Sequence, residues 1–329
     1  MFLSRGGVLA GLCAGALLVG TGVAGCGTGS GADPGPGEKP TVVAAFYPLQ
    51  YAAERITGSH ASVSNLTKPG AEPHDLELTP RDVATLEGAD LALYLKGFQP
   101  AVDDSVAQVA GDHSLDVSTL ARLTLAAAPD AHEDPHGDGE GHEGHEEEAD
   151  ADDKGHQTPD PHFWLDPLRL ADVGDGMVKH LAAVDPDHAQ AYKRNAAKLR
   201  ADLEALDEEF GTNLAKCANR DLVTSHEAFG YLAARYDFHQ EGIAGLSPEQ
   251  EPSPAELSAV ATFVRQHQVR TIYYETLVDP SVADTLATEA GAQVAVLDPL
   301  EGLTDESAGT DYLSVMRANL ATLEKGQDC

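Results

Sequence analysis

The chain has 329 residues and a formal net charge of −33, with 54 acidic side chains against 21 lysines and arginines. Such an acidic chain cannot offer the basic face that a phosphate backbone needs, so we expect no nucleic-acid partner. The hydrophobic content of 42% is that of a globular protein, and the length allows one large or two medium domains.

Residues 1–25 are predicted to be a signal peptide, because an N-terminal region with a single positive charge is followed by an apolar run. This run is too short and too rich in glycine to span a membrane. The segment ends in Val-Ala-Gly before Cys26, which resembles a bacterial lipobox. We therefore expect acylation of Cys26 and anchoring at the extracytoplasmic face of the bacterial cell membrane. The alternative is an ordinary secretory signal with an incidental cysteine. Residues 26–40, rich in glycine and proline, are expected to form a flexible tether.

Strands and helices alternate along the body of the chain. Strands are predicted at 42–46, 62–67, 91–95, 114–117, 222–225, 270–274 and 293–297, and helices at 48–58, from 80, at 166–184, 187–214 and 227–236, from 254 and at 311–323. This order predicts parallel βαβ units. We therefore expect an α/β protein with two Rossmann-like lobes and parallel sheets, at 41–186 and 216–329. The helix between the lobes, at 187–215, would span about 40 Å and join them rigidly.

Two cysteines remain once the signal peptide and Cys26 are set aside. An even pair in an oxidising compartment favours a disulfide, so we predict a bond between Cys217 and Cys329, tying the C-terminus to the start of the second lobe. The alternatives are two free thiols or two metal ligands, but neither cysteine lies in a ligand-like spacing.

Three histidines and one aspartate occupy similar places in the predicted fold. His74 and His226 follow strands, His162 precedes a helix, and Asp298 comes directly after the strand at 293–297. Ligands of open parallel sheets bind outside the carboxyl ends of the strands, so two facing lobes would bring these groups into one cleft. Three imidazoles with a carboxylate or a water make a tetrahedral zinc site.

Several carboxylates lie close to these histidines in the sequence. Asp75, Asp160 and Glu227 could accept hydrogen bonds from the rings and fix their tautomers.

Residues 126–160 interrupt the alternation, and 130–160 carry thirteen acidic residues against one base, Lys154. With almost no apolar residue the segment cannot offset its ordering entropy, and we expect a disordered surface loop. Its histidines are His132, His136, His142, His145 and His156. Because they alternate with acids, we expect them to collect metal weakly beside the cleft, the alternative being a solvated insertion.

Two patterns in this segment mimic known motifs. Residues 132–136 fit H-E-x-x-H, but Pro135 would lie inside the helix that this motif needs. Residues 139–144 fit G-x-G-x-x-G, but no strand precedes them and their acids would repel a pyrophosphate. Neither pattern supports a protease or a dinucleotide site.

Five longer strings carry a resemblance to a known family. They are GAEPHDLELTPRDV, DPHFWLDP, TSHEAFGYLA, SPEQEPSPAEL and VAVLDPL, and in order and spacing they resemble the solute-binding lipoproteins of zinc and manganese ABC importers, over about Val42 to the end. The resemblance implies two α/β lobes bridged by a rigid helix with the metal at their interface. It also implies a binding protein that is not an enzyme, with Zn²⁺ as its transported ligand and an ABC permease and its ATPase as partners. We expect a monomer.

By position, His74, His162 and His226 match the three imidazole ligands of the zinc-uptake branch, and Asp298 matches the acidic fourth ligand. The manganese branch generally has a carboxylate at the third position, so His226 favours zinc, with manganese as the alternative.

Two interpretations belong to other classes of protein. A secreted zinc hydrolase could use Glu227 to activate a water, but no second histidine follows His226 by four residues and no nucleophile motif is present. A surface adhesin has no positive signal in the sequence.

Overall fold

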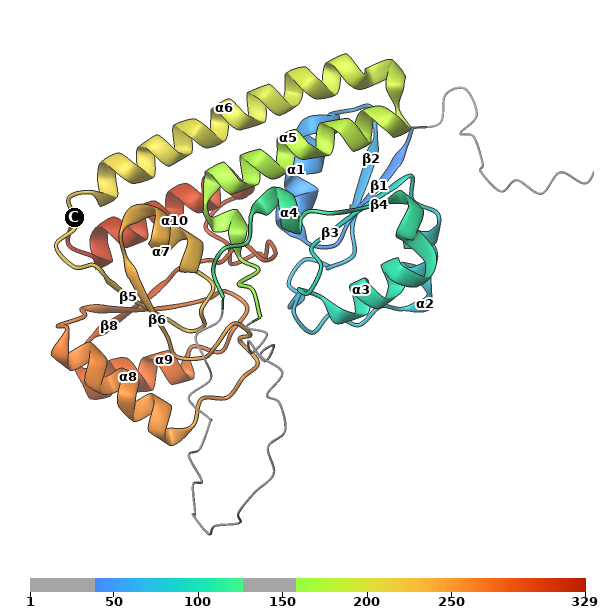
Figure 1. The fold of residues 1–329 in the computed structure, drawn as a ribbon. Helices are drawn as coiled ribbons and strands as arrows, with labels where there is room; N and C mark the ends of the chain where they lie inside the picture. The colour runs from blue at the N-terminus through green and yellow to red at the C-terminus, as the bar shows by residue number, and fades with distance from the viewer. Residues whose placement is uncertain (1–38, 127–157) are drawn as a thin grey trace, which may run out of the picture. The chain divides into compact units, whose positions relative to one another are not determined.

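The computed structural model describes residues 39–126 and 158–329 (Figure 1). The expected signal peptide, Cys26 and most of the expected acidic loop lie outside the described residues. So do the five histidines of that loop, namely His132, His136, His142, His145 and His156.

Two groups of four strands are connected through helices. The first group and its helices are β1 (Thr41–Ala44), α1 (Tyr47–Thr57), β2 (Ser62–Asn65), α2 (Pro80–Glu87), β3 (Leu91–Tyr94), α3 (Pro100–Ser105), η1 (Val106–Ala110), η2 (Gly111–His113), β4 (Ser114–Asp116) and α4 (Ser118–Ala121). The middle of the chain forms η3 (Phe163–Leu165), α5 (Pro167–Val184), η4 (Pro186–His188) and α6 (Ala189–Leu214). The second group is β5 (Asp221–Thr224), α7 (Gly230–Tyr236), β6 (His239–Gly242), α8 (Pro254–Gln266), β7 (Thr271–Tyr274), α9 (Ser281–Ala290), β8 (Gln293–Val296) and α10 (Tyr312–Gly326).

Each group of strands forms a parallel four-stranded sheet, and the two sheets have the same topology. The strand orders are β2-β1-β3-β4 in the N-terminal lobe and β6-β5-β7-β8 in the C-terminal lobe. All the neighbouring strands within these two sheets pair in parallel, which confirms the two-lobe α/β fold expected from the sequence. In such sheets the strand order reverses beside the first strand, so the carboxyl ends of β1 and β5 are where a ligand is expected.

The helices α5 and α6 pack against each other as a hairpin along the lobes (Figure 1). The buried face of α6 consists of Tyr192, Ala196, Leu199, Leu203, Leu206, Phe210 and Leu214, at the helical spacing seen in the sequence. Through it α6 contacts α1 of the N-terminal lobe and α7 and α10 of the C-terminal lobe. One hydrophobic core runs through both lobes, so apolar burial holds them together. The predicted lobe boundaries stay predictions, because the hairpin packs on both.

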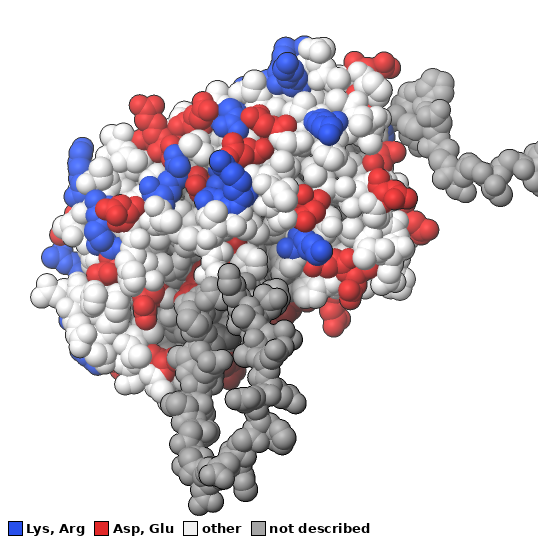
Figure 2. Space-filling view, in the orientation of Figure 1, with Lys and Arg blue, Asp and Glu red and all other residues white. Residues whose placement is uncertain are grey.

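Charged side chains cover the outer surface of this hairpin, where lysines and arginines alternate with acids (Figure 2). Arg200 pairs with Asp172 at 2.7 Å and with Asp175 at 2.6 Å. Exposed pairs of this kind stabilise a fold by only about 0–1 kcal/mol each, so we assign the rigidity of the hairpin to its buried face.

Cys217, just after α6, forms a disulfide with Cys329, and the C-terminus lies beside the end of α6 (Figure 1). Among residues 39–126 and 158–329, none of the helices combines the length and the apolar character that a membrane crossing requires.

The sequence prediction missed short elements in both lobes, including α3 and α4 in the first and β6 and α9 in the second. The edge strand β6 was not predicted, because His239–Gly242 carries polar side chains and a glycine. Helix α7 begins at Gly230 and not at Glu227, since residues 225–227 form a bend beside the cleft. Residues 158–160 of the expected loop are ordered, with Pro159 bridged to Ala126.

Candidate metal centre

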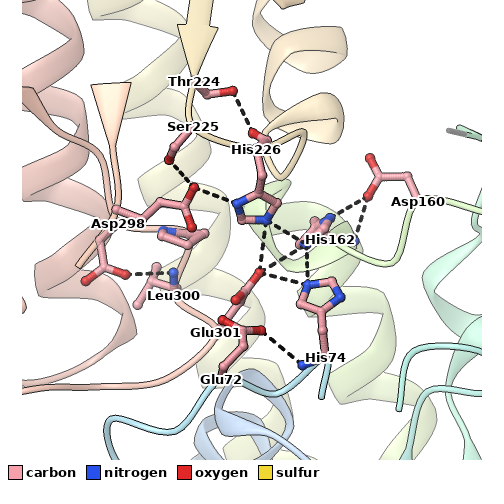
Figure 3. Close-up of polar contacts among 12 residues, drawn as sticks. Glu72, His74, Asp160, His162, Thr224, Ser225, His226, Asp298, Leu300 and Glu301 are labelled. Carbon is pink, nitrogen blue, oxygen red and sulfur yellow. Dashed lines mark hydrogen bonds and ion pairs between the residues drawn. The ribbon is translucent and has the colours of Figure 1, made fainter. Parts of the chain in front are cut away.

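Three histidine side chains from distant parts of the chain meet between the lobes (Figure 3). His74 lies in the loop between β2 and α2, His162 directly precedes η3, and His226 follows β5. The Nε2 atom of His162 lies 3.3 Å from that of His74 and 3.4 Å from that of His226. The cleft predicted from strand ends therefore exists, and it brings the three predicted histidines together.

A glutamate carboxylate completes this cluster. Oε1 of Glu301 lies 3.3 Å from Nε2 of His74, 3.1 Å from that of His162 and 3.3 Å from that of His226. All four donor atoms lie within 4.8 Å of one another. The cluster of three histidines and Glu301 is called the His₃Glu centre below.

The spacing within the His₃Glu centre is that of a tetrahedral zinc shell. Ligand bonds of about 2.0–2.1 Å place tetrahedral donor atoms about 3.3–3.4 Å apart. Five of the separations between these donor atoms are 3.1 to 3.4 Å. In addition, Oε2 of Glu301 is buried and finds no hydrogen-bond partner among the described residues. A cation between the four side chains would offset the negative charge of this buried and incompletely bonded carboxylate.

The rings of His162 and His226 are oriented by carboxylates behind them. Nδ1 of His162 lies 2.8 Å from Oδ1 of Asp160, and Nδ1 of His226 lies 2.5 Å from Oε1 of Glu275. A hydrogen on each Nδ1 donates to its carboxylate, which leaves the lone pair of Nε2 directed into the centre. The sequence correctly suggested Asp160 for this role, whereas the acceptor for His226 is Glu275 and not Glu227.

The prediction for Asp298 needs a correction, because its carboxylate does not face the histidines. Oδ1 accepts a hydrogen bond from the backbone N–H of Leu300 at 2.8 Å, and Oδ2 accepts one from the hydroxyl of Ser307 at 2.8 Å. Both oxygens are therefore used in closing the turn after β8. The acid that reaches the His₃Glu centre is Glu301, three residues further along the chain.

The turn that carries Glu301 is held rigidly. Leu300 has a φ of 58°, a left-handed conformation that is costly for a residue other than glycine. The side chain of Asn319 donates to the carbonyl of Asp298 at 2.7 Å, and the indole of Trp164 donates to the carbonyl of Pro299 at 2.7 Å. These contacts offset the cost and direct Glu301 into the cleft.

Burial and charge shift the proton affinities in opposite directions within the metal-free centre. Burial would lower the pKa of His162, but hydrogen bonds to Asp160 and Glu301 outweigh it and raise that pKa. The pKa of His226 is raised well above its ordinary value, because Glu275 and Glu301 outweigh burial. The pKa of His74 is lowered, chiefly by burial. Burial opposes ionisation of Glu301, yet hydrogen bonds from the three histidines hold its pKa well below the ordinary value.

A neighbouring carboxyl behaves differently. Burial, and then the charge of Glu301, raise the pKa of Glu72 to about 8. Glu72 accepts a hydrogen bond from the backbone N–H of His74 at 3.0 Å. It therefore supports the loop that carries His74.

Access to the centre is asymmetric. The side chain of His74 is 10% exposed, whereas those of His162 and His226 are fully buried. A cavity of about 490 Å³ opens beside His74 between the lobes, lined by Phe98, Pro161, Glu227, Glu241 and Ile243 among others. A small ion therefore reaches the centre past His74.

A closed shell of three imidazoles and one carboxylate, buried between two α/β lobes, defines a two-lobed binding protein for a borderline-soft divalent metal ion. Residues 42–326 match the family described as "Zinc-uptake complex component A periplasmic". The chain belongs to this family.

Relatives of established name cover nearly the whole chain. It is 34% identical over 310 residues to the high-affinity zinc uptake system protein ZnuA of Bacillus subtilis, covering 92% of each chain. It is 33% identical over 296 residues to the zinc-binding lipoprotein AdcA of Streptococcus pneumoniae, a match that covers 88% of this chain and 56% of that protein. The chain thus spans just over half of the length of the AdcA relatives.

Solved structures show the same fold. The laminin binding protein Lmb of Streptococcus agalactiae, described as bifunctional with adhesin and metal transporting activity, aligns with a TM-score of 0.72 at 31% identity, covering 88% of this chain and all of that one. The Zn(II)-bound ZnuA-like domain of Streptococcus pneumoniae AdcA aligns with a TM-score of 0.69 at 30% identity, covering 89% and 100%.

Proposed function

We propose that this protein is the extracytoplasmic solute-binding component of an ABC importer, which captures Zn²⁺ between its lobes and delivers it to a permease driven by an ATPase. The observation that carries the proposal is the His₃Glu centre, in which four donor atoms lie at the separations of a tetrahedral zinc shell. Membership of the zinc-uptake family supports the same metal and the same kind of transport. We propose that the protein acts as a monomer.

The proposed ligands are Nε2 of His74, His162 and His226 and the carboxylate of Glu301. Imidazole nitrogens favour zinc over manganese, because Mn²⁺ prefers oxygen donors. The carboxylates of Asp160 and Glu275 behind two of the rings make the imidazoles better donors and add negative charge around the cation.

Binding and not hydrolysis fits this centre. A catalytic zinc site keeps one coordination position open for water, whereas structural and sequestering sites are filled by protein ligands. Here four protein donors fill the tetrahedron, and three of them are completely buried. The ion would have no open position at which to activate a water.

Two further features of the proposal fall on residues outside the described part of the chain. We propose that Cys26 carries the lipid anchor, which the name of the AdcA lipoprotein supports for that relative. We also propose that the histidines of residues 130–156 gather zinc weakly near the cleft. Deleting 130–156 should then remove weak zinc sites and leave one tight site.

The test is metal binding by the chain from residue 41 onward. Elemental analysis should find one zinc per protein, and chelator competition should show that Zn²⁺ displaces Mn²⁺. His226→Ala should lose the tight site, whereas His267→Ala, which removes a surface histidine bonded to Asp221, should keep it. Absence of stoichiometric metal, a preference for Mn²⁺, or tight zinc binding by the His226→Ala variant would overturn the proposal.

A second activity is suggested by the laminin-binding neighbours. Binding to immobilised laminin, measured with and without a zinc chelator, would test it. Adhesion that persists after the metal is removed would favour an adhesin role independent of transport.

A further inference from the structure

The hydroxyl of Tyr231 binds three backbone groups of a different part of the chain. It accepts hydrogen bonds from the N–H groups of Thr124 at 3.1 Å and Leu125 at 3.3 Å, and it donates to the carbonyl of Asp160 at 3.2 Å. The N–H of Asp160 in turn donates to the carbonyl of Leu125 at 3.0 Å. Tyr231 is buried, and the guanidinium of Arg169 lies 4.4 Å from the centroid of its ring. Its hydroxyl is therefore held in one place and fixes the backbone at Asp160.

Asp160 connects this contact to the His₃Glu centre. Its Oδ1 accepts hydrogen bonds from both the backbone N–H of His162, at 2.9 Å, and the Nδ1 of the same ring, at 2.8 Å (Figure 3). The position of the Asp160 carboxylate therefore decides where Nε2 of His162 points.

The residue before Tyr231 limits the other side of Asp160. A Cβ atom added to Gly230 would lie 2.6 Å from Oδ2 of Asp160, which is far inside van der Waals contact. The absence of a side chain at 230 therefore lets the carboxylate lie against the start of α7. Gly230 therefore leaves room for the side chain of Asp160, and Tyr231 fixes its backbone.

We propose that Gly230 and Tyr231 are positioning residues for the metal ligand His162. They act through Asp160, and they form the start of α7, directly after the segment that supplies His226. The orientation of His162 is thus fixed by the C-terminal lobe, although Asp160 and His162 come from the chain that precedes α5. This inference rests on the proposed zinc function and adds to it the residues that slow the release of the ion.

The physical consequence is preorganisation. A ring held at Nδ1 presents its Nε2 lone pair to the ion without a search for the correct rotamer, and it cannot swing away once the ion is bound. If α7 moves relative to Asp160, this support is lost at the same time as His226 is displaced. Two of the ligands would therefore loosen together when the C-terminal lobe shifts.

The first variant is Tyr231→Phe, which removes only the hydroxyl. We expect Zn²⁺ to dissociate roughly tenfold faster, measured by stopped-flow transfer to a chromogenic chelator, because partners behind a ligating histidine typically contribute 10–100-fold in affinity. With Co²⁺ in place of Zn²⁺, we also expect the visible absorption bands to change in position or intensity, since the geometry of one nitrogen ligand changes.

The matched control is Tyr236→Phe on the same helix. The hydroxyl of Tyr236 donates a hydrogen bond to Asp207 at 2.9 Å, and not to Asp160 or the histidines. This variant removes a comparable hydrogen bond from α7, so a merely structural effect on the helix should appear in both variants. We expect the control to leave the zinc dissociation rate and the Co²⁺ spectrum unchanged.

A second variant, Gly230→Ala, approaches the same contact from the other side. Alanine favours a helix more than glycine does, so this change should not weaken α7 by itself. Its methyl group should displace the carboxylate of Asp160 and speed zinc dissociation severalfold.

The inference is overturned if Tyr231→Phe and Gly230→Ala both release zinc at the rate of the unaltered protein, or if Tyr236→Phe alters the rate and the Co²⁺ spectrum as much as Tyr231→Phe does. Failure of the unaltered protein to bind zinc would instead contradict the proposed function.

Discussion

Asp298 and Glu301 lie in one turn after β8, yet their carboxylates do different work (Figure 3). Asp298 accepts hydrogen bonds from the backbone of Leu300 and the hydroxyl of Ser307, whereas Glu301 lies within 3.3 Å of three imidazole nitrogens. Asp298 stabilises the turn through its hydrogen bonds, and the turn places the carboxylate of Glu301 in the His₃Glu centre. Removing each charge separately should therefore have unequal effects on metal binding.

Glu301→Gln should weaken zinc binding by more than about 100-fold, beyond the range typical of residues behind the ligands, because it removes the only anionic donor of the four. Asp298→Asn keeps an oxygen for the N–H of Leu300, and we expect it to weaken binding by at most about tenfold. Chelator-competition titrations of both variants make the comparison. Equal losses, or a larger loss for Asp298→Asn, would restore Asp298 as the ligand.

The sequence predicted the fold class and the meeting of the three histidines for a physical reason. Apolar runs such as Val42 to Phe46 identify parallel strands, and the carboxyl ends of such strands lie at one edge of a sheet. His74 and His226 follow strands, so they could be placed in one cleft without knowledge of the tertiary packing. His162 precedes a helix, and its place beside them was supported by its loop position and by the family resemblance.

The identity of the acid could not be obtained in this way. Asp298 follows the strand directly, and strand-end reasoning selects it. The turn that directs Glu301 into the centre places Leu300 in a left-handed conformation, which no local signal predicts for leucine. The partner of His226 was missed for a similar reason, because Glu275 follows β7, fifty residues beyond Ser225, and is brought close by strand pairing.

Trp164 should report zinc binding through its fluorescence. It is the single tryptophan of the chain, it is fully buried, and its ring centroid lies 5.3 Å from that of His162. Binding of the ion replaces protons on the histidine rings of the His₃Glu centre with a divalent cation. The electric field at the indole therefore changes. We expect a saturable change in emission with a one-to-one endpoint. The His226→Ala variant, titrated in the same way, should show no such endpoint, and an unresponsive emission in the unaltered protein would contradict the placement of Trp164 beside the ion.

Zinc binding should release protons at neutral pH. The pKa values of His162 and His226 are raised in the metal-free protein, so these rings hold protons at a pH where a free imidazole has lost them. Zinc needs their Nε2 lone pairs, and binding must expel those protons. As the pH falls through the raised pKa values, the affinity for zinc therefore falls, and this decline begins above about pH 6.5, the ordinary value for histidine.

The pKa values of His74 and Glu301 are lowered. Protonation of these two ligands therefore weakens zinc binding only at more acidic pH. Calorimetric titrations in buffers of different ionisation enthalpy count the protons released, and we expect a net release of protons near neutrality. A count of zero, with an affinity that is flat from pH 8 to pH 6, would show that the rings are neutral before the ion binds.

The disulfide should stabilise the fold without forming part of the metal centre. Cys217 and Cys329 are 112 residues apart in the sequence, and closing so long a loop restricts the unfolded chain. Replacing both cysteines by serine should lower the free energy of unfolding by about 2–5 kcal/mol, measured by urea denaturation of the metal-free protein. The C-terminal segment keeps other attachments, since the N–H groups of Ala218 and Asn219 donate to the carbonyls of Asp328 and Gln327 at 3.2 and 3.1 Å.

Zinc should compensate for this loss, because an ion that binds only the folded state stabilises it by about 4 kcal/mol when its free concentration is a thousand times the dissociation constant. When both proteins are metal-free, the serine variant should therefore unfold at a lower urea concentration than the unaltered protein. When free zinc is buffered at a thousand times the dissociation constant, the variant should recover most of this difference. Its dissociation constant for zinc should be unchanged, since neither cysteine contacts a ligand or the carboxylates behind the rings. A serine variant that folds normally but binds zinc more weakly would mean that the end of α6 and the C-terminus transmit strain to the cleft.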